Sequence, residues 1–368
     1  MSDPFETEER RRLRELVRAF VEREVVPHLD EWERAGEIPR RLHRTAAGVG
    51  ILGIGFAEDV GGSEGDLVDT VVVIEEIIQA GGSSGLVAAL FTHGIALPHI
   101  VATGRGDLIE RFVLPTLAGE RIGCLAVTEP GGGSDVAGIR TTAVDQGDHY
   151  LVNGSKTFIT SGARADFATT AVRTEDGFRL LVIEDFQVTR RLEKMGWHCS
   201  DTAELAFVDV RVPKDHVVGG FPELMTHFAT ERITLAVQAY ATAQRCLDLT
   251  LAWARDRHTF GRPLSSRQLV RHRLAEMARQ VEVARTYVRH VAVRVASGER
   301  LVTEVAMAKN TAVATCDHVV DQAVQLHGGL GYVRDAEVER HYRDARILGI
   351  GGGTTEIMNE IIAKQLGV

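Results

Sequence analysis

The amino-acid sequence predicts an α+β fold of three consecutive parts: an N-terminal α-helical domain (1–120), a middle antiparallel β domain of barrel or sandwich type (121–218) and a C-terminal four-helix bundle (219–368). Two observations lead to this prediction. Apolar residues recur at helical spacing in the first and last thirds. The middle third instead consists of short runs rich in β-branched residues, punctuated by turn sequences such as Asn153-Gly154 and Asp176-Gly177.

The elements expected in the first two parts follow directly from these patterns. In the first part we expect helices over Leu13–Val25, Arg40–Ala47, Leu67–Ala80, Gly85–Val101 and Asp107–Leu117. In the second part we expect strands over Ile122–Thr128, Tyr150–Thr160, Ala168–Arg173, Leu180–Ile183 and Leu205–Val212.

The third part is expected to be a bundle of long helices. The periodic segments are Leu224–Arg255, Ser265–Ala296 and Leu301–Leu326, followed by two shorter helices on either side of a glycine turn.

Composition narrows the class of protein. A chain of 368 residues with 44% hydrophobic and 25% charged residues is typical of an ordinary globular protein. The net charge of -9 and the lack of a basic tract argue against a nucleic-acid partner. The run Ile77–Gly104 contains no Asp, Glu, Lys or Arg but is interrupted by Gly81-Gly82 and Pro98, so we expect two buried helices rather than a membrane span. The four scattered cysteines predict neither a metal site nor disulfides, and hence a reducing, cytoplasmic location.

A glycine turn near the C-terminus is the first candidate functional element. Gly351, Gly352 and Gly353 follow the charged segment Tyr342–Arg346, and Thr354 or Thr355 suits the N-cap of a new helix. Three consecutive glycines let a flat ligand approach the backbone closely. Taken alone, the same pattern fits a tight turn between two helices equally well.

Four further segments carry the same kind of signal. They are a glycine-rich loop after a strand, a strand with an aromatic residue, a turn between two long helices, and a glycine-rich helix end: Thr128–Asp135, Lys156–Gly162, Arg257–Pro263 and Gln325–Tyr332. A glycine-rich loop at a strand end exposes backbone N–H groups that can hold a polar ring edge or a phosphate. An arginine such as Arg257 can bind a diphosphate through paired hydrogen bonds.

These five segments, in this order, resemble the acyl-CoA dehydrogenases, FAD enzymes that desaturate acyl thioesters, and the resemblance covers nearly the whole chain. It implies that FAD is the only cofactor. The resemblance places the following residues at FAD: Leu125, Val127, Thr128, Gly133, Ser134, Phe158, Ile159, Thr160, Arg257, Thr259, Phe260, Gln268, Gln325, Gly328, Gly329, Thr354 and Glu356. It places these at the substrate: Ser134, Phe228, Arg232 and Gly351.

The catalytic base is where the sequence departs from most of the family. Most members have a glutamate immediately before the Gly-Thr pair, but this chain has Gly352 there, so either it is inactive or its base comes from elsewhere. The chain resembles the isovaleryl and long-chain branch, in which the base lies on the first bundle helix, at Glu231 here. Glu231 has Phe228 and Leu235 at helical spacing, which predicts a partly buried position; the alternative is an ordinary solvent-facing glutamate. Gly352 would still offer its backbone N–H to the thioester carbonyl.

The resemblance also implies partners. Arg257 and Thr259 would complete the FAD site of another subunit, giving a dimer or tetramer. We expect an acyl-CoA or acyl-carrier-protein thioester as substrate and an electron-accepting flavoprotein as redox partner, in fatty acid metabolism. Two alternatives stay open on the same fold: a flavin oxidase or monooxygenase, and a flavin-binding paralogue without turnover.

Overall fold

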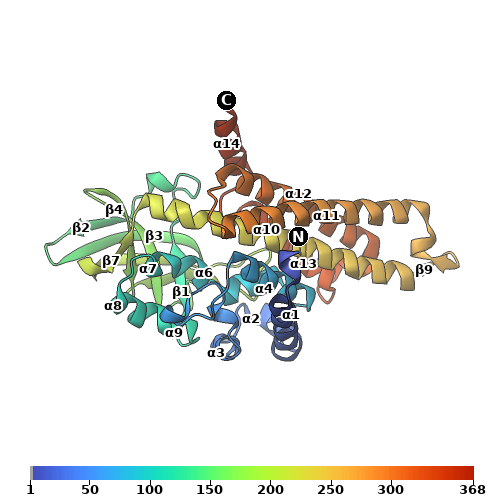
Figure 1. The fold of residues 1–368 in the computed structure, drawn as a ribbon, viewed down its shortest axis with the longest axis horizontal. Helices are drawn as coiled ribbons and strands as arrows, with labels where there is room; N and C mark the ends of the chain where they lie inside the picture. The colour runs from blue at the N-terminus through green and yellow to red at the C-terminus, as the bar shows by residue number, and fades with distance from the viewer. Residues whose placement is uncertain (1–2) are drawn as a thin grey trace. The chain divides into compact units, whose positions relative to one another are not determined.

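The computed structural model describes residues 3–368, which form two compact units (Figure 1). The first unit contains residues 3–27, Asp66–Ser84 and Ala229–Val368. The second contains His28–Gly65 and Gly85–Phe228. The N-terminal segment is therefore divided, because α4 packs with the long helix α11 and α1 packs with α4.

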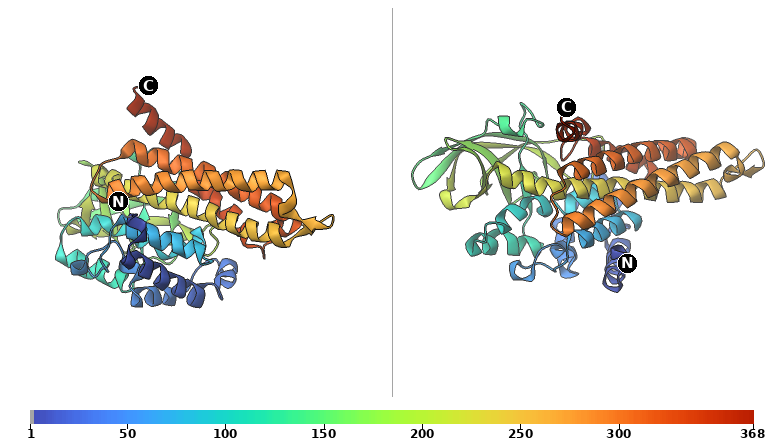
Figure 2. Two further views of the ribbon diagram at one scale, coloured as in Figure 1. Left: turned by 45° about the vertical axis from the view of Figure 1, so that its right-hand side comes forward. Right: turned by 45° about the horizontal axis from the view of Figure 1, so that its top comes forward.

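The first unit is helical. It contains α1 (Glu8–Phe20, continued by a π-helical turn over Val21–Val25), α4 (Leu67–Gln79), the part of α10 (Phe221–Asp256) that starts at Ala229, α11 (Gln268–Ala296), α12 (Val302–His327), α13 (Glu337–Ala345) and α14 (Thr355–Leu366). Figures 1 and 2 show α11 and α12 running alongside each other, and the short hairpin of β9 (His258–Thr259) and β10 (Arg262–Pro263) projecting where α10 leads into α11. Buried residues on α11 recur every three or four positions, as a helix packed on one face requires.

A buried carboxylate ties four helices of this unit together. Glu75 on α4 accepts hydrogen bonds from Arg14 on α1 (2.9 Å), from Arg289 on α11 (2.8 and 2.7 Å) and from the Tyr240 hydroxyl on α10 (2.5 Å). Burial opposes ionisation of Glu75, but the two arginines outweigh it and its pKa is lowered. The network fixes α10, the helix that carries Glu231.

The second unit begins with short helices: α2 (Leu29–Ala35), α3 (Arg40–Gly48), α5 (Ser84–Leu90, of which Gly85 onward belongs here), α6 (His93–Ala96), α7 (Pro98–Val101), α8 (Gly106–Leu108) and α9 (Leu114–Leu117). The single helix predicted over Gly85–Val101 was wrong. The Thr92 hydroxyl bonds to the Ala88 carbonyl (2.8 Å) and to Ser161 (2.6 Å) where the first break occurs, and Pro98, which lacks an N–H, starts a new helix.

The strands of the second unit form one sheet in the order β6-β7-β3-β2-β4-β5-β8, with β1 paired to β4. They are β1 (Gly123–Ala126), β2 (Thr142–Asp145), β3 (His149–Thr160), β4 (Phe167–Thr174), β5 (Gly177–Ile183), β6 (Gln187–Arg191), β7 (Thr202–Pro213) and β8 (Val217–Gly219). The β domain is confirmed, but its sheet is mixed rather than purely antiparallel, because β1 and β2 both pair with β4 in parallel. Sequence patterns missed β6, whose five residues are all exposed and carry no hydrophobic alternation.

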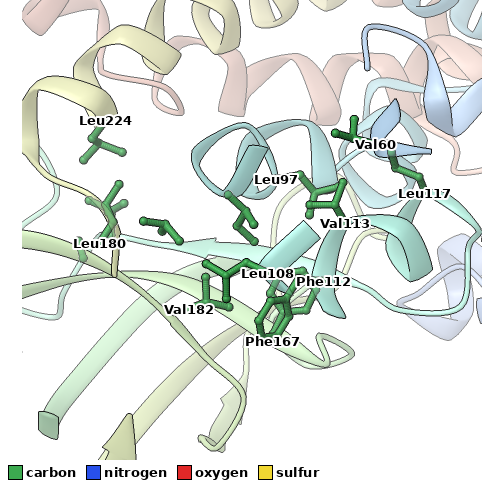
Figure 3. Packing of buried hydrophobic residues seen from close by; sticks show 14 of the residues in the cluster. Val60, Leu97, Leu108, Phe112, Val113, Leu117, Phe167, Leu180, Val182 and Leu224 are labelled. Carbon is green, nitrogen blue, oxygen red and sulfur yellow. The ribbon is translucent and has the colours of Figure 1, made fainter. Parts of the chain in front are cut away.

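A hydrophobic cluster packs the short helices of this unit against the sheet (Figure 3). The rings of Phe112 and Phe167 lie 5.0 Å apart, and Leu97, Leu180 and Val182 belong to the same cluster. Burying a phenylalanine side chain stabilises a fold by about 1.5–3 kcal/mol. The cluster therefore holds the β4–β5 face firmly, and with it the end of β1 from which the glycine-rich loop starts.

No single helix within residues 3–368 is long and apolar enough to cross a membrane; the bent pair Ser84–Leu90 and His93–Val101 passes that test only as a pair. The expected cytoplasmic location stays a prediction.

Candidate active site

Helix α10 brings Glu231 directly beside the C-terminal glycine turn. A Cβ atom placed on Gly352 would lie 3.5 Å from Glu231 Oε1 and 2.5 Å from Leu235 Cδ1. Gly352 and Gly353 have φ angles of +64° and +96°, the left-handed region that favours glycine. Two segments 120 positions apart in the chain thus form one site, and Leu235 and Glu231 fill the space that a side chain at position 352 would need.

The carboxylate of Glu231 is half-buried and stands without a hydrogen-bonding partner in the part of the chain that the structure describes. Burial raises its pKa, and the charges of Arg232 and Lys309 oppose that rise. A carboxylate with a raised pKa and no partner can take a proton from a bound molecule. A fully solvent-exposed glutamate would lack the burial that raises the pKa of Glu231.

The same two cations hold the carbonyl groups of the turn. Arg232 Nε donates to the Gly352 carbonyl (3.1 Å), and Lys309 Nζ donates to the carbonyls of Gly351 (2.7 Å) and Gly353 (2.5 Å). Thr354 caps α14 by accepting a hydrogen bond from the Ile357 N–H (3.3 Å). The turn is therefore fixed from both sides.

The glycine-rich loop of the second unit follows β1 and is bonded to β3. The Thr128 hydroxyl donates to the Thr157 carbonyl, and the Thr157 N–H donates to the Thr128 carbonyl (2.9 Å). Beneath the loop, Lys156 Nζ donates to Glu129 (2.8 Å) and to the Val127 carbonyl (2.9 Å). Leu125 belongs to β1 itself, and Gly133 and Ser134 lie farther along the exposed loop.

Next to this loop the chain presents an aromatic ring to solvent. The register of β3 against β7 shifts between Lys156 and Ile159, and Phe158 within that bulge has φ +60° with 69% of its surface exposed. A bulge costs ladder hydrogen bonds and commonly re-aims a side chain next to a functional site. Ile159 is buried in the sheet core and Thr160 ends the strand. An exposed ring, a free loop backbone and hydroxyl groups together fit a flat cofactor such as a flavin.

A second set of predicted cofactor residues gathers where α10, α11 and α12 end, within the first unit. Arg257 lies over the Trp253 ring (5.7 Å to the centroid), and Trp253 stacks on His327 (5.3 Å), which is followed by Gly328 and Gly329. On the adjoining hairpin Phe260 is 96% exposed with φ +49°. Thr259, Gln268 and Gln325 come from the same region, and the latter two are exposed. A bare aromatic ring at such a tip suits contact with another molecule.

Two other predicted residues lie apart from these groups. Phe228 packs against the cluster around Phe112 in the second unit, and Glu356 is exposed in the first turn of α14.

Three consecutive segments match known domains. Residues 7–120 match the acyl-CoA dehydrogenase N-terminal domain, residues 124–210 the middle domain and residues 219–367 the C-terminal domain. The chain belongs to the acyl-CoA dehydrogenase family. The expected enzyme class, an oxidoreductase acting on CH–CH groups with FAD as cofactor, is confirmed.

Similar proteins span nearly the whole chain. A crystal structure of a probable acyl-CoA dehydrogenase from Mycobacterium abscessus is 64% identical, with a TM-score of 0.97 over 99% of this chain and 100% of that one. The mitochondrial long-chain specific acyl-CoA dehydrogenase of Mus musculus is 38% identical over 96% of this chain and 85% of its own. A caffeyl-CoA reductase–Etf complex subunit from Acetobacterium woodii is 32% identical over 98% of both chains.

Sequence analysis missed the buried lysines Lys156 and Lys309. Lys309 had a usable signal, since it is the only charged residue between Glu304 and Asp317. Lys156 lies in a strand of polar and apolar alternation, where a charged residue is not unusual.

Proposed function

We propose that this protein removes the α-proton and the β-hydride of an acyl-CoA thioester, with Glu231 as the base. The single observation that carries the proposal is the carboxylate of Glu231 next to Gly352, the position at which most relatives have their glutamate. A base on α10 and a base at position 352 would thus serve the same point in space. This also argues against the paralogue without turnover.

The chain's own groups divide the work. Glu231 takes the proton from the carbon next to the thioester carbonyl, while the N–H of Gly352 stabilises the negative charge that grows on the carbonyl oxygen. Bound FAD would supply the two-electron acceptor for the β-hydride, so loss of the α-proton and the β-hydride would turn the Cα–Cβ single bond into a double bond and leave the flavin reduced. Burial raises the pKa of Glu231, and the charges of Arg232 and Lys309 oppose that rise by favouring the ionised form.

Two sets of residues are proposed to hold FAD. Thr128, Ser134, Phe158 and Thr160 would contact the flavin, and Arg257 and Thr259 the diphosphate of FAD in another copy of the chain. The exposed Phe260 supports such an assembly, which we propose to be a dimer or a dimer of dimers. The similarity to an Etf-complex subunit supports an electron-transferring flavoprotein as acceptor. Acyl length and the choice between CoA and a carrier protein are to be read from a substrate panel.

The decisive experiment is anaerobic reduction of the bound flavin by a panel of acyl thioesters, in the wild type and in Glu231→Gln. The substitution keeps size but removes the basic carboxylate. We expect normal FAD content and a rate of bleaching lower by about 10²–10⁴-fold, the usual contribution of general-base catalysis.

A matched control is Glu276→Gln on α11, where an exposed glutamate pairs with Arg279 on the same helix. This variant should reduce its flavin at the wild-type rate. Bleaching of Glu231→Gln at the wild-type rate would rule out Glu231 as the base. Rapid reoxidation of the reduced enzyme by air would instead favour the flavin oxidase.

A further inference from the structure

Lys309 is a fully buried lysine whose hydrogen bonds go to carbonyl oxygens rather than to a carboxylate. Its side chain on α12 is 0% exposed, among the buried residues Val305, Ala308 and Ala312. Lysine is almost never fully buried unless it is paired. Its partners here are the Gly351 and Gly353 carbonyls, on either side of the residue that faces Glu231.

In the glycine turn the carbonyl groups are all hydrogen-bonded, but not all of the N–H groups are. All three glycine carbonyls are held, two by Lys309 and that of Gly352 by Arg232. The Gly351 N–H donates to the Ile347 carbonyl (2.8 Å), whereas the N–H groups of Gly352 and Gly353 have no acceptor within residues 3–368. A peptide whose carbonyl is fixed on one side has its N–H directed to the other. Two unused donors beside an unused carboxylate are the parts of a site for a carbonyl compound with an acidic α-hydrogen.

The positive charge of Lys309 also affects the pKa of Glu231. The charged groups that act on Glu231 are Arg232, from its own helix, and Lys309, from α12. Burial lowers the pKa of Lys309 to about 8, against the opposing effect of Glu231. The ammonium form therefore predominates at neutral pH.

We propose that Lys309 is a positioning residue for the reaction: it fixes the Gly351–Gly353 turn so that the Gly352 N–H meets the thioester carbonyl, and it keeps Glu231 in its basic form. The inference rests on the proposed function. Glycine has the most freedom of any residue, so three in a row would not hold an N–H in one direction without such an anchor. The lysine thus supplies rigidity that a turn made only of glycines lacks.

A purely structural role predicts a different outcome. A lysine that only fills and stabilises the bundle would affect folding and flavin content, with a normal rate per bound flavin. A positioning residue changes the rate of flavin reduction and its pH profile in protein that still carries FAD. The two readings therefore differ in quantities measured on the holoenzyme.

The experiment compares Lys309→Met and Lys309→Arg with the wild type, using flavin reduction at saturating substrate between pH 5 and pH 9. For Lys309→Met we expect a rate per bound flavin lower by about 10²–10³-fold, as for loss of an oxyanion-hole donor, with a much smaller change in KM. The acid limb of kcat/KM should move to higher pH, because a lost positive charge leaves Glu231 harder to ionise. Lys309→Arg keeps the charge, so its acid limb should stay while its rate falls, and it serves if the methionine variant does not fold.

The matched control is Lys364→Met, which removes an exposed lysine from α14 and should behave as the wild type. The positioning role would be overturned if Lys309→Met kept both the wild-type rate and the wild-type acid limb. It would also be overturned if Lys309→Arg kept the wild-type rate. Glu231→Gln measured in parallel separates the two claims. If it abolishes reduction while the Lys309 variants do not, only the role of Lys309 fails; if it reduces normally, the proposed function fails.

Discussion

Two glycine-containing turns in this protein are each held from below by a fully buried lysine, one in each compact unit. Lys156 lies under the loop that follows β1, and Lys309 lies under the turn before α14. Both donate to backbone carbonyls of the turn that they hold. They differ in the carboxylate they face: Glu129 is hydrogen-bonded to Lys156 at 2.8 Å, whereas Glu231 makes no hydrogen bond with Lys309.

Lys156 and Glu129 thus form an ion pair, whereas Lys309 and Glu231 do not. Glu129 also accepts from the Arg140 N–H (2.7 Å) and from the N–H and hydroxyl of Thr141 (2.9 and 2.6 Å). Burial opposes its ionisation, but these bonds and Lys156 outweigh burial and lower its pKa to about 2. Glu231 has none of these bonds, so burial prevails and its pKa is raised. The same two residue types thus form a hydrogen-bonded ion pair in one unit and, in the other, leave a carboxylate that we propose acts as the base.

The largest effect is expected from breaking the closed pair with Lys156→Met. Removing one partner leaves Glu129 charged and nearly buried, which costs about 3–5 kcal/mol in comparable cases. The loop that starts at Thr128 should no longer be fixed in place, so both the FAD content and the thermal midpoint should fall. The midpoint is measured from the rise in flavin fluorescence on heating.

Lys214→Met is the control for this first substitution, because Lys214 forms an exposed ion pair with Asp145 at 2.6 Å in the same unit. Exposed pairs contribute about 0–1 kcal/mol, so its midpoint should change little. Equal thermal midpoints and equal flavin content in the two lysine variants would show that Lys156 does not fix the loop.

A medium effect is expected at the glycine turn itself. Gly352→Ala places a Cβ 2.5 Å from Leu235 Cδ1 at φ +64°, and the left-handed conformation alone costs a non-glycine residue about 1–2 kcal/mol. We expect a lower thermal midpoint and slower flavin reduction, because the N–H must shift as Leu235 is displaced.

Gly351→Ala is the matched substitution one residue earlier. Its Cβ would meet only the Ile347 carbonyl oxygen at 3.6 Å, an ordinary contact, and its φ is not positive. Its free energy of unfolding should stay within about 0.5 kcal/mol of that of the wild type. If Gly352→Ala is equally well tolerated, the turn has more room than the structure indicates.

The sequence allowed the fold to be predicted because its long helices and buried strands carry strong periodicity. The helix predicted over Leu301–Leu326 is observed as Val302–His327, and the strand predicted over Tyr150–Thr160 as His149–Thr160. The π-helical turn over Ile109–Val113 and the exposed strand β6 were missed, since neither alters the hydrophobic pattern in a recognisable way. Local signals of this kind do not report which backbone hydrogen bonds are made.

For the site, the resemblance placed both Glu231 and Gly352 at the substrate, and the apolar residues around Glu231 predicted its partly buried position. The sequence could not show that Glu231 lies next to Gly352, because the two are brought together only by the packing of α10 against the turn. The lysines were missed for the same reason. A buried lysine has meaning only through its partners, and those of Lys309 lie more than 40 positions away.

The smallest expected effect tests the opposite directions of the pKa shifts of Glu231 and Glu129. Because the pKa of Glu231 is raised in the folded protein, the folded state binds its proton more tightly than the unfolded state, and stability falls as pH rises from the ordinary glutamate pKa through the raised one. At neutral pH, above the ordinary glutamate pKa, Glu231 therefore leaves the fold less stable than it is in acid. Glu231→Gln should raise the free energy of unfolding. Stabilising substitutions typically add about 0.5–2 kcal/mol, and we expect a gain near the lower of these values. The gain should vanish below about pH 4.

Glu129→Gln should do the reverse, and this contrast completes the comparison. A lowered pKa means that the stability contributed by Glu129 is fully present above its unfolded pKa of about 4.3 and is lost as pH falls through about 2. The glutamine variant should therefore be less stable than the wild type at neutral pH and approach it in acid. Thermal midpoints of both variants between pH 3 and pH 8 would test this. A loss of stability at neutral pH in Glu231→Gln would show that Glu231, like Glu129, is held by its surroundings rather than left available for a substrate.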